Sequence, residues 1–125
     1  MKKTKAIIVW VVILMFIAAG ILFFVVSGRT PGKLDEFAKC LNDKDAVFYG
    51  AFWCSHCQNQ KVMFGKSEKL LPYVECSTPD GKGQLSVCQE KQIEGYPTWT
   101  FADGSRESGE VSLKMLSGKT GCVLP

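Results

Sequence analysis

Residues 52–58 read F-W-C-S-H-C-Q, and this stretch decides how the rest of the chain is interpreted. Only two residues separate Cys54 from Cys57, so a helix beginning here would hold both sulfur atoms in its first turn, close enough to bond. The thiolate is the reactive form of cysteine, and the free N–H groups at a helix N-terminus stabilise it. We therefore predict a catalytic redox pair in which Cys54 attacks and Cys57, further into the helix, resolves the mixed disulfide.

His56, the single histidine of the chain, lies inside this motif. A protonated imidazole would stabilise the Cys54 thiolate and make the disulfide more oxidising, which favours a catalytic role over that of a surface residue. The cysteine pair has two alternatives, a structural disulfide or half of a zinc site. A zinc site needs a second close pair, whereas the spacings from Cys57 to Cys76 and from Cys76 to Cys88 are long and unequal. We predict redox chemistry and no metal site.

The segments on either side of the motif carry strand and helix patterns in alternation. Residues 46–52 are a continuous apolar run, typical of a strand buried on both faces, and residues 33–42 place apolar side chains on one helical face. Further helices are predicted at 55–66, at 84–92 and from 111–116, with a strand at 71–76 and a hairpin of strands at 98–101 and 106–108. The order α-β-α-β-α-β-β-α predicts one small α/β domain.

The first 27 residues are set apart by composition. Residues 6–26 are uncharged and strongly apolar, and about 20 such residues span a bilayer as a helix. A cleaved signal peptide is the alternative, but its small-residue site would fall at 18–20, ahead of further apolar residues. We predict a transmembrane anchor at 1–27, a linker at 28–32 and a domain at 33–125.

Charge and cysteine content indicate where that domain lies. Lys2, Lys3 and Lys5 account for the whole net charge of +3 and favour a cytoplasmic N-terminus. The remainder is formally neutral, which argues against binding of nucleic acid. Six cysteines suit an oxidising compartment. We expect a single-pass membrane protein with an extracytoplasmic catalytic domain.

Three segments carry a family resemblance. Y-G-A-F-W-C-S-H-C-Q-N-Q-K at 49–61, Y-V-E-C at 73–76 and G-Y-P-T-W at 95–99 resemble the thioredoxin-like domain that is fused or paired to bacterial vitamin K epoxide reductase homologues. The resemblance covers about residues 34–125. It implies a thioredoxin-like disulfide oxidoreductase with a central mixed sheet flanked by helices, in which the first β-strand is missing because residues 27–32 are too short to form it.

The resemblance also implies a substrate groove. The proline that faces the cysteine pair in such proteins follows a cis peptide bond, and the matching residue is Pro97, which would present backbone beside Cys54 to a substrate. The residues expected to bind substrate are Trp53, Tyr96, Pro97 and Thr98. Trp99 either borders this groove or belongs to the core.

Two departures from the family pattern affect the chemistry. Ser55 stands where the family often has proline, so the redox potential of the family cannot be assigned to this chain. Phe48 stands where thioredoxin has a buried acid, so proton transfer from Cys57 must use another group or water.

Four cysteines remain outside the motif. The family pattern pairs Cys76 with Cys88, which are also close in sequence, either as a structural disulfide or as a second redox pair that relays electrons. Cys40 and Cys122 are then left as a possible structural pair, although four cysteines allow three connectivities.

The resemblance implies a direction for the reaction. The domain would oxidise cysteine-containing extracytoplasmic proteins and pass electrons to a quinone-linked membrane protein similar to vitamin K epoxide reductase, with no cofactor of its own. One alternative is a membrane-tethered disulfide reductase or isomerase. Another is a chaperone holding copper(I) through Cys54, Cys57 and His56, because soft thiolates suit copper.

Overall fold

A computed structural model describes residues 1–28 and 31–125. The chain divides into two compact units, Met1–Pro31 and Gly32–Pro125. Residues 29 and 30 of the predicted linker lie outside the described residues.

The first unit is a single long helix, α1 (Lys2–Gly28). Within it, the 25 residues Lys3–Ser27 form the one helix of the described chain that is long and apolar enough to cross a membrane. By length, composition and position near the N-terminus, such a helix fits a membrane anchor or a signal sequence.

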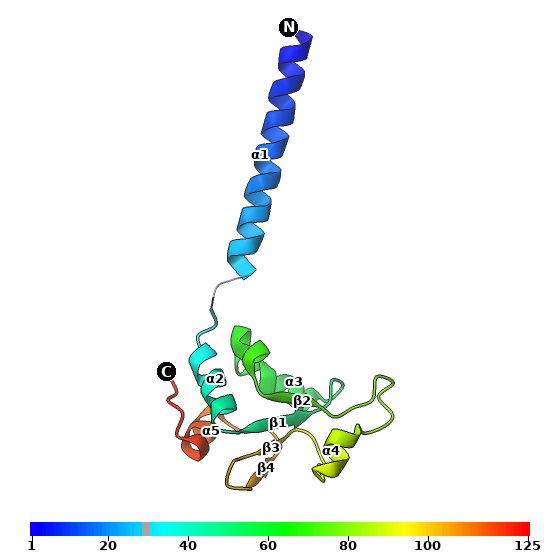
Figure 1. Cartoon of the computed structure of the whole chain (residues 1–125), viewed down its shortest axis with the longest axis vertical. Helices are drawn as coiled ribbons and strands as arrows, with labels where there is room; N and C mark the ends of the chain where they lie inside the picture. Colours follow the sequence, from blue (N-terminus) through cyan, green and yellow to red (C-terminus); the bar gives the residue numbers. More distant parts are fainter. Residues whose placement is uncertain (29–30) are drawn as a thin grey trace. The chain divides into compact units, whose positions relative to one another are not determined.

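The second unit is built on a mixed four-stranded sheet with the order β2-β1-β3-β4 (Figure 1). The strands are β1 (Val47–Gly50), β2 (Tyr73–Glu75), β3 (Thr98–Thr100) and β4 (Arg106–Ser108). Strand β1 pairs in parallel with β2 and antiparallel with β3, and β3 pairs antiparallel with β4. The motif at 52–58 therefore follows a central strand.

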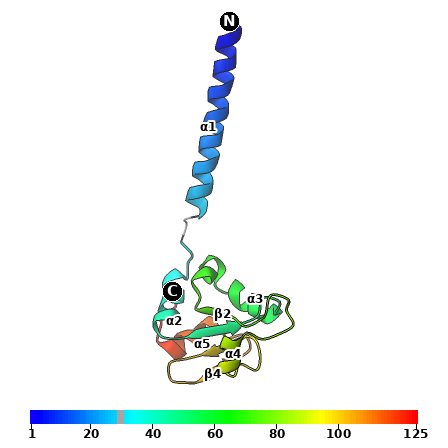
Figure 2. The same ribbon diagram turned by 45° about the vertical axis from the view of Figure 1, so that its right-hand side comes forward.

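Helices cover both faces of this sheet. In Figures 1 and 2, α2 and α3 lie on one face and α4 lies on the other. The helices of this unit are α2 (Asp35–Asp43), α3 (Ser55–Val62), α4 (Ser86–Glu90) and α5 (Leu113–Thr120), with a 3-10 helix, η1 (Gly65–Leu70). Neighbouring β1 residues enter different clusters, Phe48 the larger and Tyr49 the smaller, so β1 is buried on both faces as predicted.

Several element boundaries differ from the sequence predictions, among them those of three helices. The predicted helix at 55–66 ends at Val62, and η1 follows it, because Gly65 takes a left-handed backbone with φ +54°. The helix predicted at 84–92 is limited to Ser86–Glu90. The last helix begins later than predicted: the Ser112 side chain caps it by accepting from the Met115 N–H, and Gly121 ends it at φ 74°.

Candidate active site

Cys54 lies at the junction between β1 and α3, as the N-cap residue of that helix. Its sulfur accepts the Cys57 backbone N–H at an N···S distance of 3.4 Å. Both cysteines are free thiols, and they differ in access: Cys54 is 8% exposed and Cys57 is 0% exposed. Of the two residues, only Cys54 therefore keeps exposed surface that an incoming sulfur could reach.

The Cys57 thiol packs against the sheet at Gly50. A side chain on Gly50 would lie 3.0 Å from Cys57 Sγ and 2.8 Å from Tyr73 Cε2, so this position has no room for a larger residue. Burial, followed by the hydrogen bond with Cys54, raises the pKa of Cys57 to about 12. Cys57 is thus a protonated thiol at neutral pH in the reduced site.

The strand beneath the thiols carries aromatic rings. The Phe48 ring stacks on Trp99 with centroids 5.1 Å apart and meets the Tyr73 ring edge-on, also at 5.1 Å. Trp99 is fully buried, so of its two predicted locations it occupies the core. No carboxylate is present at the Phe48 position to take a proton from Cys57.

The backbone before Pro97 lies beside the attacking sulfur. Cys54 Sγ is 3.6 Å from the Tyr96 carbonyl oxygen, and the Tyr96–Pro97 peptide bond is cis. Trp53 is half exposed; its ring meets that of Tyr96 edge-on, with centroids 5.9 Å apart, and its Nε1 donates to Ser77 Oγ at 2.8 Å. Trp53 and the Tyr96 backbone are therefore available to a substrate near Cys54.

Thr98, one of the residues expected to bind substrate, turns its side chain into the domain. It is buried, and its hydroxyl donates to the Gly95 carbonyl at 2.8 Å. Pro97 is also buried. Strand β3 starts at Thr98, and the side chains of Pro97 and Thr98 are both buried in the domain.

His56 has a partner that sequence patterns did not reveal. Its ring is 69% exposed, and Nδ1 lies 2.7 Å from Glu110 Oε1. The Asn59 side chain donates to the same oxygen at 3.0 Å. The hydrogen bond with His56, followed by that with Asn59, lowers the pKa of Glu110. Glu110 precedes α5, far from the motif in sequence, and no local pattern marks it.

Gln60 is a second residue that sequence reasoning missed. It is fully buried, its Nε2 donates to the Val111 carbonyl at 3.0 Å, and its Oε1 accepts the Val111 N–H at 2.7 Å. This pair of bonds fixes α3, and with it the cysteine pair, to the segment before α5. In the sequence, the only sign of this role of Gln60 is that a polar residue stands in the helix after the motif.

The other four cysteines form two disulfides. Cys76 bonds Cys88 with Cα atoms 5.6 Å apart, and Cys40 bonds Cys122 with Cα atoms 5.8 Å apart. The first is the pairing that the family pattern favoured, and the second is the possible pair that the remaining two cysteines left. Both cysteines of the first disulfide have no exposed surface.

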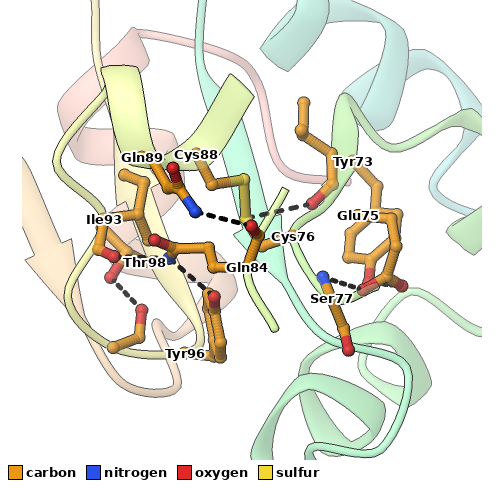
Figure 3. The surroundings of a disulfide bond; sticks show 12 residues. Tyr73, Glu75, Cys76, Ser77, Gln84, Cys88, Gln89, Ile93, Tyr96 and Thr98 are labelled. Atoms are coloured by element: carbon orange, nitrogen blue, oxygen red, sulfur yellow. Dashed lines mark hydrogen bonds between the residues drawn. A yellow bond between two sulfur atoms is a disulfide. The ribbon is translucent and has the colours of Figure 1, made fainter. Parts of the chain in front are cut away.

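The loop closed by Cys76 and Cys88 contacts Tyr96 through Gln84 (Figure 3). Gln84, inside this loop, donates through Nε2 to the Tyr96 hydroxyl and to the Ile93 carbonyl, both at 2.7 Å. The disulfide therefore supports the residue whose carbonyl faces Cys54.

Comparisons with known proteins agree with this arrangement. The thioredoxin family profile matches residues 31–117. The chain is 52% identical over 103 residues to thiol-disulfide oxidoreductase LTO1 of Arabidopsis thaliana, covering 78% of this chain and 27% of that protein. It is 30% identical over 93 residues to thioredoxin domain-containing protein 5 homolog of Drosophila melanogaster, covering 63% and 22%.

A more distant relative is protein disulfide-isomerase erp38 of Neurospora crassa, 25% identical over 81 residues that cover 62% of this chain and 22% of that protein. The chain thus spans about a quarter of the length of these curated relatives. The matches confirm the predicted fold and the predicted class of thiol–disulfide oxidoreductase.

Proposed function

Because this chain belongs to the thioredoxin family, we propose that it is a membrane-anchored thiol–disulfide oxidoreductase whose redox pair is Cys54 and Cys57. One observation carries the assignment. Two free thiols share the N-terminus of α3; Cys54 lies beside the Tyr96 carbonyl and keeps 8% of its surface exposed, whereas Cys57 is fully buried. This asymmetry gives each sulfur a separate role in exchange.

In the oxidising direction, a substrate thiolate attacks Cys54 of the Cys54–Cys57 disulfide. The S–S bond breaks, Cys57 leaves as a thiolate that takes up a proton, and substrate and Cys54 are joined in a mixed disulfide. A second substrate thiolate then attacks the substrate sulfur, which releases the oxidised substrate and Cys54 as a thiolate. Two electrons have passed from the substrate to the cysteine pair.

Reoxidation of the pair needs an electron acceptor. The acceptor is a quinone-linked membrane protein similar to vitamin K epoxide reductase, as the resemblance of residues 49–61, 73–76 and 95–99 implies. The test is reoxidation of the reduced full chain in vesicles that hold such a protein and a quinone, followed by thiol counting. If reoxidation is no faster than in vesicles without the vitamin K epoxide reductase-like protein, that protein is not the electron acceptor. The tethered reductase or isomerase is then favoured.

The domain lies outside the cytoplasm, with α1 as a retained anchor. The lysines at the N-terminal end, the length of the apolar span and the two disulfides support this topology. A membrane-impermeant thiol reagent applied to intact cells should label reduced Cys54, and the protein should stay with membranes after a high-salt wash. Labelling only after lysis would reverse the orientation, and a soluble, shortened chain would make α1 a cleaved signal.

Trapping of substrates tests the assigned roles of the two cysteines. In Cys57→Ala the attacking sulfur remains and the resolving sulfur is gone, so covalent adducts with substrate proteins should accumulate on non-reducing gels. Cys54→Ala should give far fewer adducts, because Cys57 is buried. Equal trapping by the two variants would contradict the roles.

No observation favours the copper-chaperone alternative. Within residues 1–28 and 31–125, no three His, Cys, Asp or Glu side chains are grouped closely enough to hold a metal ion. The His56 imidazole that would complete a three-ligand set is bound to Glu110.

A further inference from the structure

The resolving thiol has no acidic neighbour on the strand beneath it. Strand β1 carries Phe48 at the position where thioredoxin has a buried acid, and burial raises the pKa of Cys57 to about 12. The thiolate is nevertheless the form that attacks a disulfide, and the form that leaves when one opens. Another part of the chain must favour that thiolate.

Polar side chains from α3 and β2 gather behind Cys57. The sulfur and the edge of the Tyr73 ring meet over Gly50, each within 3.0 Å of the place that a Gly50 side chain would take. Lys61 follows Cys57 by one helical turn on the same side of α3, and its Nζ lies 3.7 Å from the centroid of the Tyr73 ring. The Tyr73 hydroxyl donates to Glu75 Oε2 at 2.7 Å, which fixes the ring.

We propose that the Lys61 ammonium, held on the face of the Tyr73 ring, stabilises the Cys57 thiolate whenever the Cys54–Cys57 disulfide forms or opens. The inference rests on the proposed redox role of these two cysteines. An aromatic face attracts a cation, so the ring keeps the charge close to the sulfur. Lys61 is a positioning residue that does not touch the substrate.

The other groups around the resolving thiol do not supply this charge. Cys54, in the same turn, raises the pKa of its partner, whereas Lys61 lowers it against the larger effect of burial. On β2, burial and the bond to Glu75 raise the pKa of the Tyr73 phenol far above its usual range, so the phenol keeps its proton. The Glu75 carboxylate is occupied by this phenol and by two backbone N–H groups. The His56 imidazole is paired with the Glu110 carboxylate.

In the step that resolves the mixed disulfide, water takes up and supplies the protons. Once a substrate is linked to Cys54, the Cys57 S–H bond breaks and the proton passes to solvent; an open hollow beside the site is lined by Lys61, Glu68, Lys69, Leu71 and Tyr73. The Cys57 thiolate attacks Cys54, the bond from Cys54 to the substrate breaks, and the Cys54–Cys57 bond forms. The substrate sulfur leaves as a thiolate and takes a proton from water.

The experiment follows both sulfurs in one reaction. The reduced full chain in detergent is mixed with less than one equivalent of a chromogenic aromatic disulfide. Attack by Cys54 releases one coloured thiolate in a phase that scales with protein concentration, and attack by Cys57 releases the second in a phase that does not. The first phase serves as an internal control for folding and access.

Lys61→Met should slow the second phase roughly tenfold at neutral pH, which equals a shift of about one pKa unit, and should move its pH profile upward by the same amount. The first phase should not change. Lys61→Arg should restore the second phase, and Lys69→Met, which removes a charge from the same hollow, should leave both phases within about twofold of the wild type.

Tyr73→Phe distinguishes the effect of the Lys61 charge from that of the Tyr73 hydroxyl, because the substitution keeps the ring and removes the hydroxyl. It should leave the second phase within about twofold of the wild type. Two results would overturn the role of Lys61. One is a second phase in Lys61→Met that is as fast as in the wild type, and the other is a second phase in Tyr73→Phe that is slowed as much as in Lys61→Met. Absence of a second phase in the wild type would instead contradict the proposed redox pair.

Discussion

Tyr96 lies between two cysteine pairs that have different surroundings. Its carbonyl is 3.6 Å from Cys54 Sγ, and its hydroxyl accepts a hydrogen bond from the loop closed by Cys76 and Cys88. The first pair begins a helix, includes one residue that is partly exposed (Cys54, 8%) and is present as thiols. The second pair is fully buried and bonded.

The difference shows that surroundings, more than the presence of two nearby cysteines, decide the role of each pair. A sulfur enters exchange when another sulfur can reach it and when its thiolate is stabilised. Cys54 keeps 8% of its surface exposed, and its sulfur accepts the Cys57 N–H at the start of α3. Cys76 and Cys88 have no exposed surface, so a substrate sulfur cannot reach them, and Gln84 in the loop they close contacts Tyr96.

Removal of Cys54 should have the largest effect. Without the attacking sulfur, Cys54→Ala should lose dithiol-dependent reduction of insulin by a factor on the order of a thousand or more. The double variant Cys76→Ala, Cys88→Ala should keep activity within about tenfold, because its chemistry is intact while the support for Tyr96 is weakened. If the double variant loses turnover with the membrane partner at unchanged stability, the second pair is a relay.

The structural disulfides should affect stability in proportion to the loops they close. With a sequence separation of 82 residues, Cys40–Cys122 should contribute about 4.5 kcal/mol to the free energy of unfolding in the chain-entropy model. Cys76–Cys88, with a separation of 12 residues, should contribute about 3 kcal/mol. Denaturant unfolding of the two double-alanine variants measures both, and the reverse order would contradict the loop account.

The Gln60 amide should affect stability more than an exposed glutamine of the same helix. Gln60→Leu leaves the Val111 N–H and carbonyl without partners in the core, which should cost about 2 kcal/mol. Gln58 is exposed and makes one bond, to the Phe52 carbonyl at 2.9 Å. Gln58→Leu should cost less than half as much in the same unfolding experiment; equal losses would show that burial of the amide is unimportant.

The smallest expected effect concerns Glu110. Glu110→Gln removes a negative charge near the N-terminus of α3 and should raise the midpoint potential of Cys54–Cys57 by no more than ~30 mV, a factor of ten in the equilibrium constant. A fall in potential would contradict this direction.

The same contact has a defined pH dependence. Because the folded-state pKa of Glu110 is lowered, the stabilisation from its contact with His56 is present above the unfolded-state pKa and is lost as pH falls through the folded-state pKa. The wild type and Glu110→Gln should therefore converge in stability in acid and differ near neutrality. A difference that persists in acid would point to a cause other than this charge.

The sequence predicted those parts of the molecule that depend on local patterns. The apolar span in α1, the buried strand β1 and the cysteine pair at the start of α3 all follow from composition and spacing. The break after Val62 was missed although Gly65 marked it, because the apolar residues at 62–64 also suit a continuing helix. Glu110, Gln60 and the contact of Lys61 with Tyr73 were missed for a different reason. They join residues distant in sequence, and only the folded sheet and helices bring them together.

A redox titration that resolves all three cysteine pairs tests the central claim most directly. The full chain in detergent is equilibrated in glutathione buffers of increasing oxidation, its free thiols are alkylated, and each cysteine is identified by mass spectrometry. The account predicts that Cys54 and Cys57 alone pass from thiols to a disulfide, as a pair, while Cys76–Cys88 and Cys40–Cys122 stay bonded throughout. Titration of Cys76–Cys88 over the same range, with Cys54 and Cys57 unchanged, would contradict it.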